Sequence, residues 1–233
     1  MTHNPTISLT TWQRWLFCLL LPALLAVTAS LSFGQAPSAV ETQRKTSTPY
    51  SGDLTIFDYP DRDQKLHLDQ VMDLLSITPG KTVADIGAGS GWFTVRAAKR
   101  VTSSGKVYAV DINPEAIAYI NQRAHKDGLA NVITILGAAD DPKLPLTSVD
   151  AVLLLKTYHE VAKPVDLMRN LRASLRPGAR VGIIDRNGNG ANHGVAKTVV
   201  LEEMQAAGYR LLEEHDELVK DDKMDYLLIF VVK

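Results

Sequence analysis

Short apolar runs alternate with helical patterns along most of the chain, and this alternation is the feature that most restricts its fold. Five apolar runs, most of them followed by a helical pattern, occupy residues 82–87, 106–111, 131–136, 150–156 and 180–185. Strands that alternate with helices form a parallel sheet covered on both faces. Two further strand-like runs, 209–218 and 225–232, have no helix between them. We therefore expect an α/β fold with a doubly wound, seven-stranded mixed sheet that ends in a C-terminal antiparallel hairpin.

The composition divides the chain into three parts. Residues 15–31 carry no charge, and Arg14 is the only Lys or Arg within residues 1–36. Such a stretch is typical of a secretory signal peptide, and its length is at the lower limit for a membrane anchor. Either interpretation of 1–36 places the rest of the chain outside the cytoplasm, in the periplasm or the extracellular space. Residues 37–62 begin with a Ser-, Thr- and Pro-rich stretch and predict a flexible linker, which leaves 63–233 as the folded domain.

Charge and cysteine content exclude several classes of function. Residues 37–233 hold 24 of the 25 Lys and Arg and all 26 Asp and Glu, a net charge of −2, whereas proteins that bind nucleic acid are usually basic. We expect a small-molecule substrate, no nucleic acid, and membrane contact only through the N-terminal anchor. Cys18 is the only cysteine and lies in the apolar run, so the exported part has no disulfide, thiol nucleophile or cysteine-based metal site.

A glycine-rich turn follows the first predicted strand, in the stretch VADIGAGSGWF. Its spacing is Gly87-x-Gly89-x-Gly91, whereas dinucleotide sites have a third small residue at the position that Trp92 occupies here. Asp85 precedes the first glycine by two residues. Its carboxylate would attract a cationic group of a ligand and would repel a diphosphate. The turn therefore favours a ligand other than a dinucleotide.

Two further acids follow the next two predicted strands. Asp111 ends the second strand, where a carboxylate can accept both hydroxyl protons of a ribose. Asp140 follows the third strand and could accept a proton from the exocyclic amine of a base. The carboxyl ends of parallel strands share one edge of a sheet, where open α/β folds bind their ligands. Three acids at that edge predict a nucleoside-type ligand.

From about residue 63 to residue 233 the chain resembles the class I S-adenosylmethionine-dependent methyltransferases, and in particular small exported bacterial members whose substrates are generally unassigned. The stretches that carry this resemblance are VADIGAGSGWF, VYAVDINPEAI, NVITILGAADD, LPLTSVDAVLLLKTYHEV and LRASLRPGARVGIID. The resemblance implies S-adenosyl-L-methionine as the cofactor, with the three glycines against its methionine part and Asp85 near its ammonium group. It also implies Asp111 on the ribose, Ile112 on the adenine ring and Asp140 at the adenine amino group.

The loop after the fourth predicted strand, KTYHEV, carries the candidate catalytic residues Tyr158, His159 and Glu160. His159 is the best candidate for a general base because the ordinary pKa of imidazole lies near neutrality, and Glu160 could orient it or act itself. The alternative is that His159 caps the strand end and Tyr158 packs in the core. His193, in a Gly- and Asn-rich loop, is a weaker candidate, and His67 is expected on the surface or in packing.

The resemblance implies methyl transfer to an oxygen or nitrogen of a small molecule. The chain lacks the Asn-Pro-Pro-Tyr-like motif of nucleic-acid amino methyltransferases after the fourth strand. It also lacks an acid at 156–158 to match the metal-dependent catechol-type enzymes, so we predict no metal ligands. A protein carboxyl methyltransferase and an exported, non-catalytic small-molecule-binding domain on the same fold stay open as alternatives. The sequence does not indicate an oligomeric state.

Overall fold

The computed structural model describes residues 44–233. The predicted signal or anchor at 1–36 and the first part of the predicted linker therefore lie outside the described residues. Within 44–233, no helix is both long enough and apolar enough to cross a membrane.

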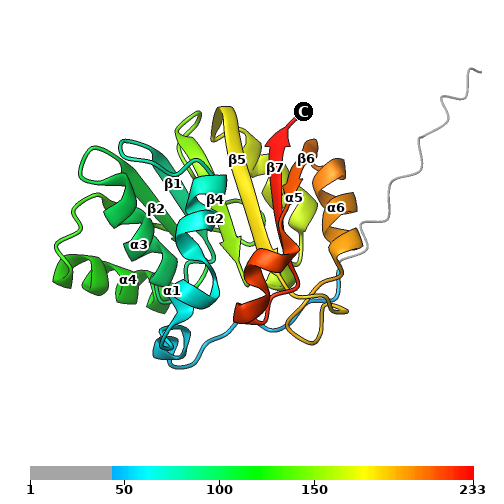
Figure 1. Ribbon diagram of the computed structural model, residues 1–233, viewed down its shortest axis with the longest axis horizontal. Helices are drawn as coiled ribbons and strands as arrows, with labels where there is room; N and C mark the ends of the chain where they lie inside the picture. The colour runs from blue at the N-terminus through cyan, green and yellow to red at the C-terminus, as the bar shows by residue number, and fades with distance from the viewer. Residues whose placement is uncertain (1–43) are drawn as a thin grey trace, which may run out of the picture. The chain divides into compact units, whose positions relative to one another are not determined.

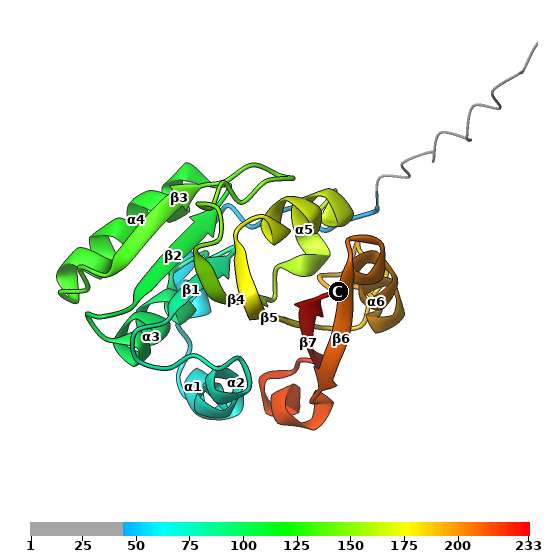
Figure 2. The ribbon, with the colours of Figure 1, turned by 90° about the horizontal axis from the view of Figure 1, so that it is seen from above.

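The described chain forms one seven-stranded sheet, in the order β3-β2-β1-β4-β5-β7-β6 (Figures 1 and 2). Neighbouring strands from β3 to β5 pair in parallel, whereas β7 pairs antiparallel with both β5 and β6. The strands are β1 (Thr82–Ile86), β2 (Lys106–Asp111), β3 (Val132–Leu136), β4 (Val149–Leu155), β5 (Leu175–Asp185), β6 (Tyr209–Glu214) and β7 (Tyr226–Val232). The predicted mixed sheet with a C-terminal antiparallel hairpin is confirmed.

Helices cover both faces of the sheet (Figure 2). Buried residues of α2, α3 and α4 pack on one face, and those of α5 and α6 pack on the other. The α-helices are α1 (Arg62–Lys65), α2 (Leu68–Leu74), α3 (Trp92–Val101), α4 (Pro114–Lys126), α5 (Pro164–Arg172) and α6 (Lys197–Ala206). Three 3-10 helices join them, η1 (Leu54–Phe57), η2 (Tyr158–Glu160) and η3 (Asp216–Asp222). Because parallel strands are buried on both faces, the apolar runs 151–155 of β4 and 181–184 of β5 are buried, as the sequence predicts.

The segment 44–62, which we call the N-terminal segment, differs from the flexible linker that its composition predicts. Its chain crosses the edge at which the parallel strands end (Figure 1). The Arg44 guanidinium contacts the Glu203 carboxylate at 2.9 Å and donates to the Val161 carbonyl at 2.9 Å. The buried Ser47 hydroxyl donates to the Gly190 carbonyl at 3.0 Å. A lack of helical or strand periodicity predicts irregular backbone, but it does not exclude such specific side-chain contacts.

Candidate functional site

A cavity of 920 Å³ lies at the carboxyl ends of β1, β2, β4 and β5, on the inner side of the N-terminal segment. This is the edge of the sheet where the sequence predicts the ligand. The predicted site residues that line the cavity are Asp85, Gly87, Gly89, Asp111, Ile112, His159, Glu160 and His193. Gly91, Asp140 and Tyr158 are not among its lining residues.

The glycine turn after β1 brings bare backbone to the cavity wall. Gly87 and Gly89 have φ angles of +71° and +53°, in the left-handed region that side chains disfavour. A Cβ on Gly87 would lie 2.1 Å from Cγ2 of Thr157, so only glycine fits there. A Cβ on Gly89 would meet only the Phe57 ring, at 3.7 Å, across the cavity. Gly91 caps the start of α3 and packs against Ile120 instead of the cavity.

Asp111 is fixed at the end of β2 by two backbone groups. Its Oδ2 accepts a hydrogen bond from the Gly89 amide at 2.8 Å, and its Oδ1 accepts one from the Asn113 amide at 2.9 Å. These bonds couple the end of β2 to the glycine turn and leave further lone pairs on both oxygens for a ligand. The neighbouring Ile112 is 50% exposed and also lines the cavity, so its side chain is free to pack on a ring.

Asp85 is buried under the glycine turn, where it lines the cavity. Its Oδ2 accepts a hydrogen bond from the Thr94 hydroxyl at 2.6 Å. Burial raises the pKa of Asp85 to about 7, against the opposing effect of the Thr94 hydrogen bond, and the nearby Asp111 charge raises it further. A cationic ligand group beside Asp85 would favour its ionised form.

Asp85 should make the stability of the cofactor-free protein depend on pH. Its folded-state pKa is raised, so its contribution is fully present below pH 3.8 and is lost as the pH rises through about 7. Over this pH range the free energy of unfolding falls by about 4 kcal/mol. Asp85→Asn keeps an acceptor for Thr94 and should remove this dependence. Urea unfolding at pH 5 and pH 8 measures it, with the exposed Asp127→Asn as a control; equal pH dependence in wild type and Asp85→Asn would contradict the assignment.

Asp140 does not reach the cavity, contrary to its predicted role at an adenine amino group. Its side chain is 45% exposed and lies 3.9 Å from the Lys163 ammonium. The backbone bends tightly between Ala138 and Asp141, which pair through an isolated bridge. Ala138 and Ala139 line the cavity in place of Asp140. The sequence shows that an acid follows β3, but not which way the turn directs it.

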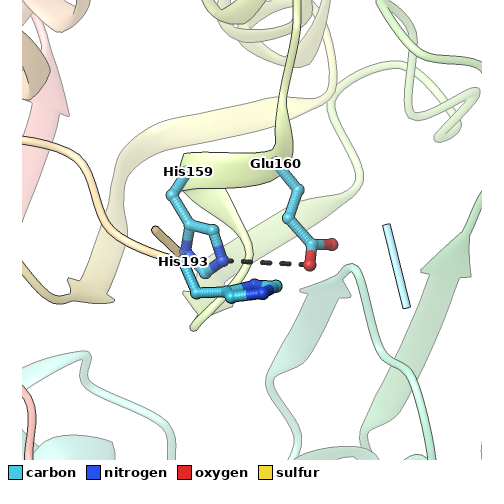
Figure 3. A group of neighbouring side chains, drawn as sticks. All are labelled: His159, Glu160 and His193. Carbon is cyan, nitrogen blue, oxygen red and sulfur yellow. Dashed lines mark ion pairs between the residues drawn. The ribbon is translucent and has the colours of Figure 1, made fainter. Parts of the chain in front are cut away.

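His159 and Asp185 form a buried pair at the ends of β4 and β5. The Nδ1 of His159 lies 2.8 Å and 2.9 Å from the two carboxylate oxygens of Asp185, and the His159 amide donates to Oδ2 at 3.0 Å. This pairing places the proton on Nδ1 and leaves Nε2 free for chemistry. The Nε2 lies 3.8 Å from Oε1 of Glu160 (Figure 3). Burial raises the pKa of Glu160 to about 7; the nearby His159 opposes the rise, while the Asp185 charge adds to it.

Tyr158 is separated from this pair, although it precedes His159 in the chain. It is fully buried in the core on the α5 and α6 side of the sheet. The Arg44 guanidinium lies over its ring, 5.1 Å from the centroid. Tyr158 therefore packs in the core, which was the alternative to its predicted catalytic role. The reason is that η2 directs the side chains of Tyr158 and His159 to different sides.

His193 joins His159 and Glu160 from a distant part of the chain (Figure 3). Its ring centroid lies 5.8 Å from that of His159, with the two rings nearly perpendicular. Single ligand atoms of His159, Glu160 and His193 all lie within 4.8 Å of one another. His67 lies elsewhere, where its Nε2 is 3.6 Å from Asp221, and it does not line the cavity.

The sequence interpretation missed two contributors to the site. Asp185 holds His159, and the only signal for it was an acid at the end of a predicted strand. The N-terminal segment lines the cavity with Tyr50, Phe57 and Tyr59. Its anchor is the buried Arg62, which lies 4.1 Å from the Trp92 ring centroid and donates to the Phe57 carbonyl at 2.7 Å. Three aromatic residues within ten positions are atypical of a flexible linker and could have indicated a packed segment.

Sequence comparisons connect the chain to known enzymes. A family model described as a methyltransferase domain matches residues 77–228. An uncharacterized methyltransferase of Mycobacterium tuberculosis is 30% identical over 155 residues, which cover 66% of this chain and 52% of the relative. A protein-L-isoaspartate O-methyltransferase of Pyrococcus horikoshii is 28% identical over 111 residues, which cover 48% of this chain and 47% of the relative. The chain thus spans about half the length of the curated relatives it matches.

Solved structures share the fold. A SAM-dependent methyltransferase from Aquifex aeolicus superposes with a TM-score of 0.70 at 24% identity, over 78% of this chain and 100% of that one. Aeropyrum pernix fibrillarin with natively bound S-adenosyl-L-methionine gives a TM-score of 0.55 at 17% identity, over 72% of this chain and 73% of that one. At these identities the likeness shows the fold, and it confirms the predicted Rossmann-like sheet.

Proposed function

We propose that this chain, which belongs to the methyltransferase domain family, methylates an oxygen or nitrogen of a small molecule with S-adenosyl-L-methionine as its cofactor. The acceptor atom forms a bond to the methyl carbon, the carbon–sulfur bond breaks with its electron pair left on sulfur, and the acceptor loses a proton. The observation that carries the proposal is one cavity that holds both a bare glycine turn beside two carboxylates and a buried His–Asp pair.

The residues at the ends of β1 and β2 fit the cofactor. The space beside Gly89 is a cradle that a side chain would enter. Asp111 offers fixed carboxylate oxygens that suit a ribose diol, and Ile112 offers an exposed apolar surface that suits an adenine ring. Asp85 provides a buried carboxylate for an ammonium group. The carboxylates of Asp85 and Asp111 beside the glycine turn would repel a diphosphate, which supports a nucleoside-type ligand.

The other end of the cavity fits the activation of an acceptor. Asp185 orients His159 so that Nε2 lies next to Glu160 and lines the cavity. A group in this position can take the proton of an acceptor, a contribution of about 10²–10⁴ in rate. The N-terminal segment lines the cavity with aromatic side chains, and a concave, mostly apolar pocket suits a small acceptor. Protein substrates are the second candidate, because a protein-L-isoaspartate O-methyltransferase is among the relatives.

A screen for transfer of a labelled methyl group tests the proposed function. The full chain is incubated with labelled S-adenosylmethionine and sets of phenols, amines, carboxylates and an isoaspartyl peptide. Label in a small molecule supports the proposal, and label in the peptide supports the second candidate. Tight S-adenosylmethionine binding without methyl transfer to any of these compounds would count against the proposed oxygen or nitrogen acceptor.

Asp111 should contribute measurably to cofactor affinity. A charge-assisted hydrogen bond is worth about 1.5–3 kcal/mol, so Asp111→Ala should weaken S-adenosylmethionine binding about 10–150-fold. Calorimetric titration measures this, with the exposed Asp127→Ala as a matched control. An effect below about threefold would move the ribose contact to another residue.

A further inference from the structure

A second kind of ligand fits the end of the cavity that carries His159. One nitrogen of His159, one of His193 and one oxygen of Glu160 lie within 4.8 Å of one another (Figure 3). Two imidazoles and a carboxylate are the ligands of several catalytic zinc sites, in which a fourth position stays open. Within residues 44–233, this is the one group of three or more His, Cys, Asp or Glu residues close enough to share an ion.

The contacts around His159 are those of a metal ligand. Histidines that bind metals usually donate their second ring N–H to a carboxylate, which fixes the ring and raises its basicity. Asp185 performs this role here, because both of its oxygens lie within 2.9 Å of Nδ1. Asp185 is itself held by the amides of His159 and Arg186, at 3.0 Å and 2.8 Å. Nε2 is therefore directed at Glu160 by a rigid, buried support.

His193 is held in an unfavourable backbone conformation that brings its ring to the cluster. Its φ is +56°, in the left-handed region that residues other than glycine seldom adopt. The Ser47 hydroxyl accepts from the His193 amide at 2.8 Å, and the Arg186 guanidinium donates to the His193 carbonyl at 2.9 Å. The N-terminal segment and the end of β5 thus secure His193 from both sides.

No Lys or Arg within the described residues 44–233 pairs with Glu160. Among the ion pairs within residues 44–233, its only partner is His159, at 3.8 Å. Its side chain is 22% exposed, so water compensates its charge only in part. A divalent cation between Glu160 and the two imidazoles would supply the missing positive charge.

We propose that His159 Nε2, His193 and Glu160 bind one divalent transition-metal ion, with Zn²⁺ as the ion that best suits two imidazoles and a carboxylate. Zinc bonds of 2.0–2.1 Å in a tetrahedral site place ligand atoms about 3.4 Å apart. The three ligand atoms lie within 4.8 Å of one another, so they have to move about 1 Å closer together. Rotation of the Glu160 and His193 side chains allows this movement, because Asp185 fixes only His159. This proposal departs from the sequence prediction of no metal ligands, which rested on the absence of an acid at 156–158.

The ion would serve the reaction at its open position, an inference that rests on the proposed function. A hydroxyl bound to a divalent ion has a lowered pKa and loses its proton more readily. The site therefore favours acceptors with a hydroxyl group that must be deprotonated, over amines that are already nucleophilic. With the ion bound, His159 acts as a ligand instead of taking the proton directly, and the proton passes to solvent.

Calorimetric titration of the untagged, chelator-treated full chain with Zn²⁺ alone tests the site. We expect one Zn²⁺ per chain, and Co²⁺ should give the visible absorption of a tetrahedral complex. His193→Ala and Glu160→Gln should each weaken Zn²⁺ binding at least about 10-fold, and Asp185→Asn about 10–100-fold. The matched control is His215→Ala, since His215 pairs with Glu213 and does not line the cavity.

The inference would be overturned if the wild type did not bind Zn²⁺. It would also be overturned if wild type, His193→Ala and Glu160→Gln bound Zn²⁺ with equal affinity. S-adenosylmethionine is titrated into the same chelated samples, so that a failure of cofactor binding counts against the proposed function and leaves the metal site standing. Full methyl transfer by the chelated protein, with no gain on adding Zn²⁺, would overturn the role of the ion in acceptor activation.

Discussion

His159→Ala is expected to lower turnover about 10²–10⁴-fold, with cofactor affinity nearly unchanged. The imidazole lines the cavity beside Glu160 and is held by Asp185. It makes no hydrogen bond to the glycine turn or to Asp111, which should hold the cofactor. Its loss therefore removes acceptor activation, whether the ring takes the proton itself or binds an ion that makes the proton easier to lose. Single-turnover kinetics together with calorimetry separate the two parameters.

His159→Ala should also destabilise the fold. The buried Asp185 would lose a hydrogen-bond partner, at a cost of about 1–3 kcal/mol in the free energy of unfolding. His159→Asn is the better second variant, because its amide can still donate to Asp185 but offers no ring nitrogen. The exposed His125→Ala on α4 is the matched control. A lower melting temperature with unchanged turnover per folded molecule would assign His159 to packing alone.

Gly89→Val should abolish cofactor binding while the sheet stays folded. The side chain would fill the space between the turn and the Phe57 ring, and it would disturb the amide that donates to Asp111. The loss of about 3 kcal/mol or more in binding free energy corresponds to at least about 100-fold in Kd. Gly87 is less suitable for this test, because a Cβ there would collide with Thr157 and disturb the fold.

Gly128→Val is the control for Gly89→Val. Gly128 has a φ of +68° at the end of α4, and a Cβ on it would meet nothing within 4 Å. Both substitutions impose the backbone strain of a left-handed conformation, but only the one at Gly89 enters the cavity. Equal cofactor affinity in the two variants, measured alongside their melting temperatures, would show that the glycine turn does not hold the cofactor.

The sheet was predictable because each of its elements has a local signal. Residues 106–111 and 180–185 are apolar runs that a helix precedes or follows, and they form the whole of β2 and the end of β5. Asn113 caps α4 through the Glu115 amide, as the sequence indicates. The last two strands pair antiparallel, as expected when no α-helix lies between them, and η3 joins them. These signals act within a few residues and need no tertiary information.

The site was predictable where the backbone alone fixes a residue and unpredictable where a turn sets the direction of a side chain. Asp111 and the glycines lie at the cavity edge because their strand and turn end there. Asp140 and Tyr158 follow β3 and β4 within a few residues, but a tight turn and η2 direct them elsewhere. His193 reaches His159 because the loop after β5, the strand that pairs with β4, folds back toward η2. No spacing in the sequence connects these two positions.

The N-terminal segment shows the limit of composition as a guide. Its Ser and Thr content suggests a linker, but Arg44, Ser47 and Arg62 fix it through contacts with Glu203, Gly190 and Trp92. Such contacts depend on the tertiary structure, which is why the position of the N-terminal segment over the cavity was not predicted. Because Ser47 accepts a hydrogen bond from the His193 amide, the N-terminal segment also helps to position His193 beside His159.

Calorimetric titration of the full chain with S-adenosylmethionine, with NADH as a competitor, tests most directly whether the cavity is a methyl-donor site. We expect one cofactor per chain, a raised melting temperature on binding, and loss of binding in Gly89→Val. The absence of any binding heat or thermal stabilisation with S-adenosylmethionine, or tighter binding of NADH, would contradict the assignment.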